Sequence, residues 1–456
     1  MIFKSINPTN EQTVAEYPAM TDAEVETTIS SAQRAFLAWR NRSFDERAKV
    51  LRQVADAIDD AEQELAGFIT REMGKPISQS IAEVRKSAGL CRHYAEHSAS
   101  YLASQTIDLP DGQAMVVPEP LGVVYSITPW NFPIWQLVRL AIPTIAAGNA
   151  VVVKPAPNVI GSAEKLIELF KRSDAPEGLY QCLRIDHGQS DRVIADDRIV
   201  ALGLTGSERA GSAVGASAGH HLKKVVLELG GSDPFIVLAD ADVQRAAKVA
   251  AVARFQNAGQ VCIAAKRILV AESVSSEFMD AFLAEVDAMK IGDPTLADVF
   301  IGPMARGDLR DEIERQMSTA ITAGARVVRR GGTMHGPGFF YDPSVIVGGD
   351  NTPFMNDEIF GPAVVVVPLA TEEALIRVAN ETRFGLSASL WTSDQERAAN
   401  LARQIEAGCV FVNTMSRSDA AFPLGGIKRS GFGRELGREG AREYTNLKTI
   451  VMSSTV

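Results

Sequence analysis

Short apolar segments alternate with amphipathic helical segments along most of this chain, and this alternation restricts its fold more than any other feature. In the first half, the expected strands are residues 150–154, 180–184, 199–205 and 223–229, and the expected helices are residues 162–171 and 208–217. Strands separated by helices predict a parallel sheet with helices on both faces. Ligands bind such sheets at the carboxyl ends of the strands.

The same alternation begins again after Pro234. The expected strands are residues 235–238, 268–270, 326–328, 363–367, 387–391 and 409–413, and the expected helices are residues 242–255, 276–289, 372–380 and 396–405. A chain of 456 residues is long for one hydrophobic core and suggests two or three domains. We therefore predict an α/β fold with two domains, each built on an open, parallel-rich sheet.

Helices are expected before the first sheet. Capping boxes at residues 21–24 and 43–46 predict one helix that runs towards Trp39 and a long amphipathic helix that continues to Ile69. A third helix is expected over residues 80–101. A turn signal at residues 110–112 precedes strand-like residues 115–118 and 123–126, which indicate a surface hairpin, and residues 449–452 indicate a terminal strand.

Charge and composition exclude several classes of function. The formal net charge of −10 argues against binding nucleic acid or an anionic membrane surface, although a pocket can still be locally cationic. No apolar run reaches the ~18–20 residues of a membrane span, and residues 1–8 lack signal-peptide features. Cys91, Cys182, Cys262 and Cys409 are widely spaced, which predicts neither disulfides nor a metal site. Reduced thiols fit a cytoplasmic location.

The chemistry of the chain is expected between residues 228 and 262. Glu228 precedes the pair Gly230-Gly231, and Cys262 follows the small and polar residues 257–260. A carboxylate can act as a base and a thiolate as a nucleophile, and glycines let a ligand approach the backbone closely. An isolated cysteine is more often an inert core residue. The polar and glycine flanks of Cys262 favour a reactive thiol instead.

The motif Glu-Leu-Gly-Gly-x-x-Pro, which starts at Glu228, and the motif Gly-Gln-x-Cys, which ends at Cys262, closely resemble those of the aldehyde dehydrogenase superfamily. The resemblance covers nearly the whole chain and is strongest to the short bacterial succinate-semialdehyde dehydrogenases. It implies a homodimer or homotetramer. The implied domains are a dinucleotide-binding domain (1–106 and 125–230), a catalytic domain (231–424), a return segment (425–445) and an oligomerisation element (107–124 and 446–456).

The resemblance also implies the roles of the reacting residues. The Cys262 thiolate attacks the aldehyde carbon, and the Asn131 amide with the Cys262 backbone N–H stabilises the oxyanion. Hydride passes to a nicotinamide cofactor and leaves a thioester, which is hydrolysed by water that Glu228 activates. From the residues alone, Asn131 could also be a helix N-cap.

Cofactor-binding residues are implied at several strand ends and turns. They are Thr128, Trp130, Lys154, Pro157, Gly206, Ser207, Leu229, Glu358 and Phe360. Gly206 and Ser207 open a helix, and helix N-termini bind phosphates. By themselves, however, a Gly-Ser pair and a turn containing Phe360 are weak signals.

The cofactor preference is predicted from Lys154 and Pro157. Lys154 resembles the lysine that contacts the adenosine ribose, and NAD-preferring members often carry a glutamate three residues later. Pro157 at that position removes a carboxylate that would repel the 2′-phosphate of NADP, and Lys154 could pair with this phosphate. We therefore predict that NADP is preferred and that NAD is also used.

The resemblance places four residues at the aldehyde. Arg139 and Ser418 resemble a clamp on the substrate's distal carboxylate, Gln256 replaces a second clamp arginine, and Trp135 would line the pocket. Succinate semialdehyde is the first predicted substrate and glutarate semialdehyde the next. Arg139 could instead be a helix-surface residue, and an uncharged aldehyde, a coenzyme A-acylating reaction and a protein without turnover remain alternatives.

Overall fold

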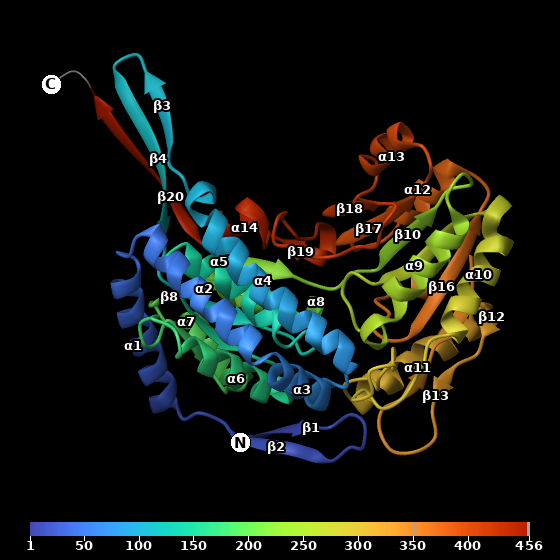
Figure 1. The fold of residues 1–456 in the computed structure, drawn as a ribbon. Helices are drawn as coiled ribbons and strands as arrows, with labels where there is room; N and C mark the ends of the chain where they lie inside the picture. Colours follow the sequence, from blue (N-terminus) through green and yellow to red (C-terminus); the bar gives the residue numbers. More distant parts are fainter. Residues whose placement is uncertain (350–351, 454–456) are drawn as a thin grey trace.

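The computed structural model describes residues 1–349 and 352–453, in which a six-stranded sheet forms the centre of the first lobe (Figure 1). Its strands, in spatial order, are β19 (Gly431–Phe432), β9 (Lys224–Glu228), β8 (Ile199–Thr205), β5 (Val123–Ile127), β6 (Ala150–Lys154) and β7 (Tyr180–Cys182). All neighbours are parallel except β19, which pairs antiparallel with β9 at Glu228. The carboxyl ends of β5, β6, β8 and β9 therefore meet at one edge.

Helices cover this sheet and bury its apolar residues. They are α1 (Asp22–Trp39), α2 (Phe44–Asp60), α3 (Glu62–Met73), α4 (Ile77–Tyr101), α5 (Trp135–Ala146), α6 (Ile160–Phe170), α7 (His187–Ala195), α8 (Glu208–His220) and α14 (Gly437–Glu443), with the short 3₁₀ segments η1 (Pro157–Val159) and η5 (Lys428–Ser430). Both predicted capping boxes form, at Thr21 and Ser43. The long predicted helix is wrong, because Ala61 leaves the helical conformation and separates α2 from α3. Ile58 and Leu65, on either side of this break, are both buried.

A seven-stranded sheet forms the second lobe. Its spatial order is β12 (Arg326–Arg329), β15 (Ser344–Val347), β16 (Ala363–Leu369), β11 (Ala265–Ala271), β10 (Asp233–Val237), β17 (Ser387–Trp391) and β18 (Cys409–Val412). Only the β12–β15 pair is antiparallel among these. Its helices are α9 (Val243–Phe255), α10 (Ser275–Asp287), α11 (Gly307–Thr322), α12 (Glu372–Asn380) and α13 (Gln395–Ala402), with η2 (Gln256–Gly259), η3 (Glu272–Val274), η4 (Pro353–Met355) and the small ribbon β13 (Gly332–Thr333) and β14 (Tyr341–Asp342). The predicted α/β fold with two parallel-rich sheets is confirmed.

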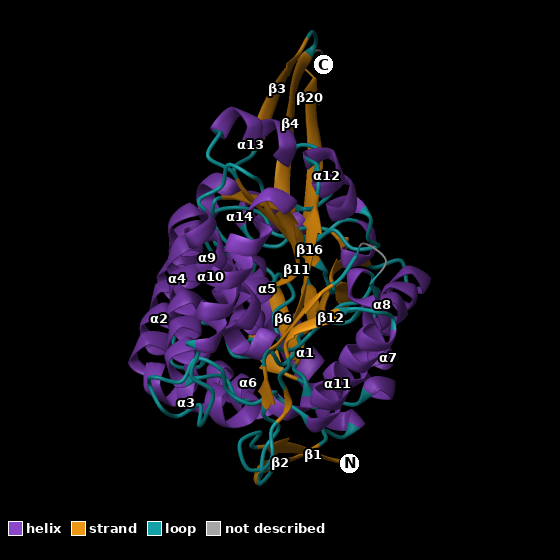
Figure 2. Cartoon of the chain, turned by 90° about the vertical axis from the view of Figure 1, so that its right-hand side faces the viewer, coloured by secondary structure: helices purple, strands orange, loops and turns teal. Residues whose placement is uncertain are grey.

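A three-stranded antiparallel arm projects from the first lobe, as both ribbon views show (Figures 1 and 2). It consists of β3 (Gln105–Leu109), β4 (Gly112–Pro120) and β20 (Thr445–Ser453). The predicted hairpin partner at residues 123–126 is wrong, because β5 is a central, buried strand of the six-stranded sheet. The predicted terminal strand lies within β20, and residues 454–456 lie outside the described part. A ribbon of β1 (Ile2–Ile6) and β2 (Thr13–Pro18) lies at the opposite end of the molecule (Figure 2).

Candidate active site

Cys262 lies in the loop between α9 and β11, and this loop has an unusual backbone. Asn257, Ala258 and Gly259 have φ values of 53°, 52° and 72°. The left-handed region is unfavourable for residues with a Cβ, and such residues concentrate at functional sites. The segment therefore needs strong external contacts to hold the thiol in one place.

Arg254 provides part of that support from inside the protein. It is fully buried, and its guanidinium donates hydrogen bonds to the carbonyls of Gly259 (3.3 Å), Ile359 (2.9 Å), Ala363 (2.8 Å) and Gly361. Burial lowers the pKa of Arg254 to about 9. One side chain thus fixes the cysteine loop against the segment that carries Glu358 and Phe360.

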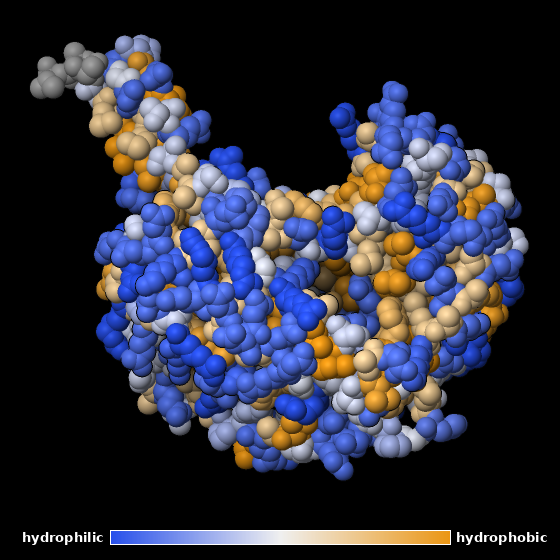
Figure 3. Space-filling model, in the orientation of Figure 1, coloured by the Kyte–Doolittle hydropathy of each residue, from blue (hydrophilic) through white to orange (hydrophobic). Residues whose placement is uncertain are grey.

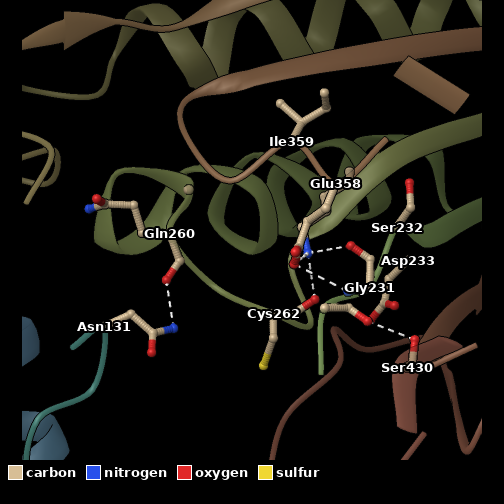
Figure 4. A network of polar contacts seen from close by, with 12 residues as sticks. Asn131, Gly231, Ser232, Asp233, Gln260, Cys262, Glu358, Ile359 and Ser430 are labelled. Atoms are coloured by element: carbon tan, nitrogen blue, oxygen red, sulfur yellow. Dashed lines mark hydrogen bonds and ion pairs between the residues drawn. The ribbon is translucent and has the colours of Figure 1, made fainter. Parts of the chain in front are cut away.

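Lys266 connects the same parts from the other side of the thiol. Its buried ammonium donates to the carbonyls of Gly231 and Cys262, both at 2.6 Å, and to the Glu358 carboxylate at 3.1 Å. The Gly231 N–H donates to the same Glu358 oxygen at 3.2 Å. A Cβ on Gly230 would overlap the Glu358 carboxylate, which explains the glycine pair. Figure 4 shows this network, with the Cys262 sulfur pointing away from Glu358.

Asn131 faces the cysteine loop from the segment that follows β5. Its amide nitrogen donates to the Gln260 carbonyl at 2.9 Å (Figure 4), and its backbone carbonyl accepts from the Asn257 amide at 2.9 Å. An amide carries two N–H donors, so the second one remains for an oxyanion. The alternative role as a side-chain N-cap does not occur, because α5 begins without a side-chain cap.

The thiol of Cys262 lies where two pockets meet. Cys262 lines a pocket with Trp130, Gly206, Glu358 and Phe360, and it also lines a second pocket of about 240 Å³ on its other side. The space-filling view shows the hollow between the two lobes (Figure 3). Two ligands can therefore reach the same sulfur from different directions.

Charges around the thiol act against the effect of burial. Desolvation raises the pKa of Cys262 to about 11, whereas Arg139 and then Lys266 lower it. Glu228 ends β9, is buried, and has a carboxylate oxygen without a hydrogen-bond partner among the described residues. Burial raises the pKa of Glu228 well above its usual range, and the Arg139 charge opposes that shift. Burial thus favours the protonated form of both groups, and the nearby Arg139 charge favours their ionised forms.

The first pocket collects most of the predicted cofactor residues. Trp130, Gly206, Ser207, Leu229, Glu358 and Phe360 line it together with Asn131 and Cys262. Ser207 caps α8, whose free N–H groups open towards this pocket. The Trp130 and Phe360 rings meet edge to face with centroids 5.8 Å apart. Planar, apolar and phosphate-binding features therefore occur in one cavity, which suits a nicotinamide dinucleotide.

Thr128, Lys154 and Pro157 lie beside this pocket rather than in its lining. The Thr128 N–H donates to the Lys154 carbonyl at 3.1 Å, where β5 and β6 end. The Lys154 ammonium has no hydrogen-bond or ion-pair partner within residues 1–349 and 352–453, and burial lowers its pKa. Pro157 begins η1 and is exposed. The structure thus offers an unpaired cation at the strand ends and no carboxylate at position 157.

The second pocket contains all four predicted substrate residues, Trp135, Arg139, Gln256 and Ser418. Arg139 is buried, and its guanidinium forms an ion pair with Glu435 and donates to Thr205 at 2.9 Å. Although burial would lower it, the pKa of Arg139 is raised by Glu435 and then by Glu228 and Cys262. Arg139 is therefore no helix-surface residue, and its charge is already balanced inside the protein.

Several charged residues of this site, among them Lys86, Arg254, Lys266 and Glu435, were absent from the sequence prediction. Lys266 did carry a signal, since it lies in the strand Ala265–Ala271, where every residue is buried. Arg254 ends an alanine-rich helix and Lys86 lies on a mostly polar one, and neither pattern distinguishes them from solvated residues.

No cluster of three or more His, Cys, Asp or Glu residues that could hold a metal occurs in the described part of the chain. The same part has no helix that is both long and apolar enough to span a membrane. Fold and site therefore define a two-lobed α/β protein in which a cysteine thiol separates a dinucleotide-type pocket from a pocket for a second ligand.

Comparison with known sequences identifies the family to which this two-lobed α/β protein belongs. The sequence profile described as the aldehyde dehydrogenase family matches residues 1–450, and the chain belongs to this family. It is 44% identical, over 98% of this chain and 97% of the relative, to a succinate semialdehyde dehydrogenase [NAD(P)+] of Escherichia coli strain K12. It is also 44% identical, over 99% of both chains, to a probable succinate-semialdehyde dehydrogenase [NADP(+)] of a Synechocystis strain.

A solved structure has the same fold. The succinic semialdehyde dehydrogenase from Streptococcus pyogenes, in complex with NADP+, superimposes with a TM-score of 0.97 at 33% identity, over 99% of this chain and 100% of that one. The family resemblance drawn from the Glu228 and Cys262 motifs is therefore confirmed.

Proposed function

We propose that this protein oxidises succinate semialdehyde to succinate with NADP+, its preferred cofactor, or NAD+. The observation that carries the proposal is that one thiol, Cys262, lines both the dinucleotide-type pocket and the second pocket. The relatives at 44% identity are named for this substrate and for NAD(P)+ or NADP+, which supports both choices. NAD(P)+ in the first pocket would supply the hydride acceptor.

The residues around the sulfur have complementary tasks. Cys262 as thiolate adds to the aldehyde carbon, and the second N–H of the Asn131 amide with the Cys262 backbone N–H holds the oxyanion. Loss of hydride converts this thiohemiacetal into a thioester. Glu228 then takes a proton from water, the resulting hydroxide attacks the thioester carbonyl, and the C–S bond breaks to give the acid and regenerate the thiol.

Several residues would hold the cofactor in this proposal. Glu358, fixed by Lys266 and the Gly231 N–H, would accept from the nicotinamide ribose, and Phe360 and Trp130 would lie beside the ring. Helix α8 would receive the diphosphate. Lys154 would pair with the 2′-phosphate of NADP, since its ammonium has no other partner among the described residues.

The domain roles and the assembly follow the same proposal. Residues 1–106 and 125–230, with the return segment 425–445, bind the dinucleotide, and residues 231–424 supply the thiol. The arm is proposed over residues 107–124 and 446–456. Among the residues that the structure describes, one edge of β20 has no partner strand, and Ile450, Val451 and Met452 of this strand are exposed. A homodimer or homotetramer would cover this edge. A cytoplasmic location fits the absence of disulfides in the described residues.

One assay tests the function. Purified protein is mixed with succinate semialdehyde and NADP+ or NAD+, with and without coenzyme A, and the absorbance of the reduced cofactor is followed. We expect reduction without coenzyme A and a higher kcat/KM with NADP+. Cys262→Ala should abolish turnover and retain cofactor binding. No reduction with either cofactor would refute the proposal, and a strict requirement for coenzyme A would indicate an acylating enzyme.

A further inference from the structure

The pocket on the substrate side of Cys262 is rich in positive charge. Four cationic residues line it, namely Lys75, Lys86, Arg139 and Arg417. Apart from them, the lining consists mainly of apolar and neutral polar side chains. A pocket of this kind favours an anionic ligand with a short apolar body. The cation that binds the anion should not already be paired with a carboxylate of the protein.

Three of the four cations already have an acidic partner. Lys75 forms a buried ion pair with Glu83, and Arg139 forms one with Glu435. Arg417 lies 3.9 Å from Asp419 and is exposed. Each of these charges is therefore offset by a carboxylate of the protein, and an incoming carboxylate would have to compete with it.

Lys86 differs from the other three. Its ammonium donates to the Ser418 hydroxyl at 2.7 Å and lies 4.0 Å from the centre of the Trp135 ring. Within the described residues no carboxylate lies within ion-pairing distance of it. An ammonium has three N–H donors, so Lys86 retains donors for a ligand. Lys86 lines the pocket and stays partly accessible to solvent, so a ligand can reach it.

A second observation points to a missing acceptor at the same place. The indole N–H of Trp135 is buried and has no hydrogen-bond partner among the described residues. Trp135 lines the pocket next to Lys86, and Ser418 adds a hydroxyl. Buried donors normally find an acceptor, and a carboxylate with two oxygens would satisfy the ammonium and a neutral donor together.

We propose that Lys86, assisted by Ser418 and Trp135, binds the distal carboxylate of the aldehyde substrate and determines the preference for ω-carboxy aldehydes. This inference rests on the proposed function. Arg139 then has a positioning role, because its guanidinium is paired with Glu435 and lies near Glu228 and Cys262. The residue that recognises the substrate charge is thus the lysine of α4 rather than the arginine of α5.

The proposal has a consequence for pH. Desolvation by the pocket walls lowers the pKa of Lys86 to about 8, and the Arg139 charge adds to this effect. Glu83 and Asp419 act in the opposite direction, and Lys75 acts in the same direction as Arg139. Arg417, which lines the pocket, and Glu435, which pairs with Arg139, are the remaining charged residues beside it. Above about pH 8 the ammonium loses its proton, and the KM for an anionic aldehyde should increase.

The test compares succinate semialdehyde with butanal, which has a similar length and no carboxylate. In Lys86→Gln, the ratio of kcat/KM for succinate semialdehyde to that for butanal should fall by roughly 10- to 100-fold, the range of a charge-assisted hydrogen bond. The loss should appear mainly in KM. Lys86→Arg should restore part of the ratio and remove the increase of KM above about pH 8. Arg85→Gln is the matched control, because Arg85 precedes Lys86 on α4, is exposed at the surface and pairs with Glu62.

The outcomes separate this inference from the proposed function. If the wild-type enzyme does not prefer succinate semialdehyde over butanal, the proposed function is wrong. If the wild type shows the preference and Lys86→Gln keeps it, the assignment of Lys86 is wrong alone. The double variant Arg139→Gln/Glu435→Gln removes the buried Arg139–Glu435 ion pair without leaving either charge unpaired. If that variant selectively loses the preference for succinate semialdehyde over butanal, and Lys86→Gln retains it, Arg139 would be the residue that binds the substrate carboxylate.

Discussion

Replacement of Arg254 should show how much the catalytic loop depends on one buried side chain. Arg254 donates to four carbonyls, which belong to Gly259 in the cysteine loop and to Ile359, Gly361 and Ala363 near Glu358. Arg254→Met keeps most of the apolar stem and removes every donor. The variant therefore isolates the hydrogen bonds from the packing.

The magnitude follows from which carbonyls lose their partner. Gly361 keeps a hydrogen bond from the Ala363 N–H, whereas the carbonyls of Gly259 and Ile359 have no other donor among the described residues. A buried carbonyl without a partner costs about 1–3 kcal/mol. Two of them give roughly 2–6 kcal/mol, and removal of the desolvated guanidinium offsets part of this. We expect the free energy of unfolding to fall by about 2–4 kcal/mol.

The same change should impair turnover, because residues 257–259 need this support to keep their left-handed conformation. Urea unfolding monitored by circular dichroism gives the stability, and steady-state kinetics give kcat, which should fall at least about tenfold. Arg403→Met, at an exposed position in the same lobe, is the control and should change stability by less than about 0.5 kcal/mol. An equally small change in Arg254→Met, with normal kcat, would refute the reasoning.

Three further predictions concern the reaction. Asn131→Ala should lower kcat by about 10²–10³-fold in steady-state assays, because it removes an oxyanion donor; a loss below about threefold would exclude that role. Pro157→Glu should shift the kcat/KM ratio towards NAD+, since its carboxylate would repel a 2′-phosphate beside Lys154, and an unchanged ratio would contradict the phosphate argument. Because desolvation raises the pKa of Cys262 to about 11, the thiolate fraction increases with pH. With butanal as substrate, kcat/KM should thus rise between about pH 6 and pH 9, and a flat profile would contradict a thiol that is protonated at rest.

Much of the fold could be predicted from local sequence patterns. The alternation of apolar and amphipathic segments gave the two parallel-rich sheets, and the capping boxes at Thr21 and Ser43 form as expected. The helix boundaries were harder to predict, since Ala61 has high helix propensity and nevertheless separates two helices. The strand at Val123–Ile127 was assigned to the wrong sheet, because sequence proximity to a turn does not define the partner strand.

The position of Cys262 at a pocket could be expected from its motif, and the catalytic roles of Cys262 and Glu228 stay predictions. Partners that meet only in space could not be expected in this way. Glu435 pairs with Arg139 across almost 300 positions of sequence, and Lys86 meets Ser418 across 332. Nothing in the neighbourhood of either residue indicates its partner, so the electrostatic balance of the pocket became visible only in three dimensions.

The chain passes between the lobes twice, and both passages run beside the thiol. The outward passage joins β9 to β10 through Gly230 and Gly231, and the return passage reaches β19 through Ser430. The Ser430 hydroxyl donates to the Gly230 carbonyl at 2.7 Å (Figure 4), and its backbone carbonyl accepts from the Leu229 N–H at 3.0 Å. A rotation of one lobe against the other would have to bend both connecting segments, which are hydrogen-bonded to each other near the Cys262 sulfur. Substrate entry and product exit should therefore proceed through the open mouths of the two pockets, with the lobes staying in place throughout the cycle.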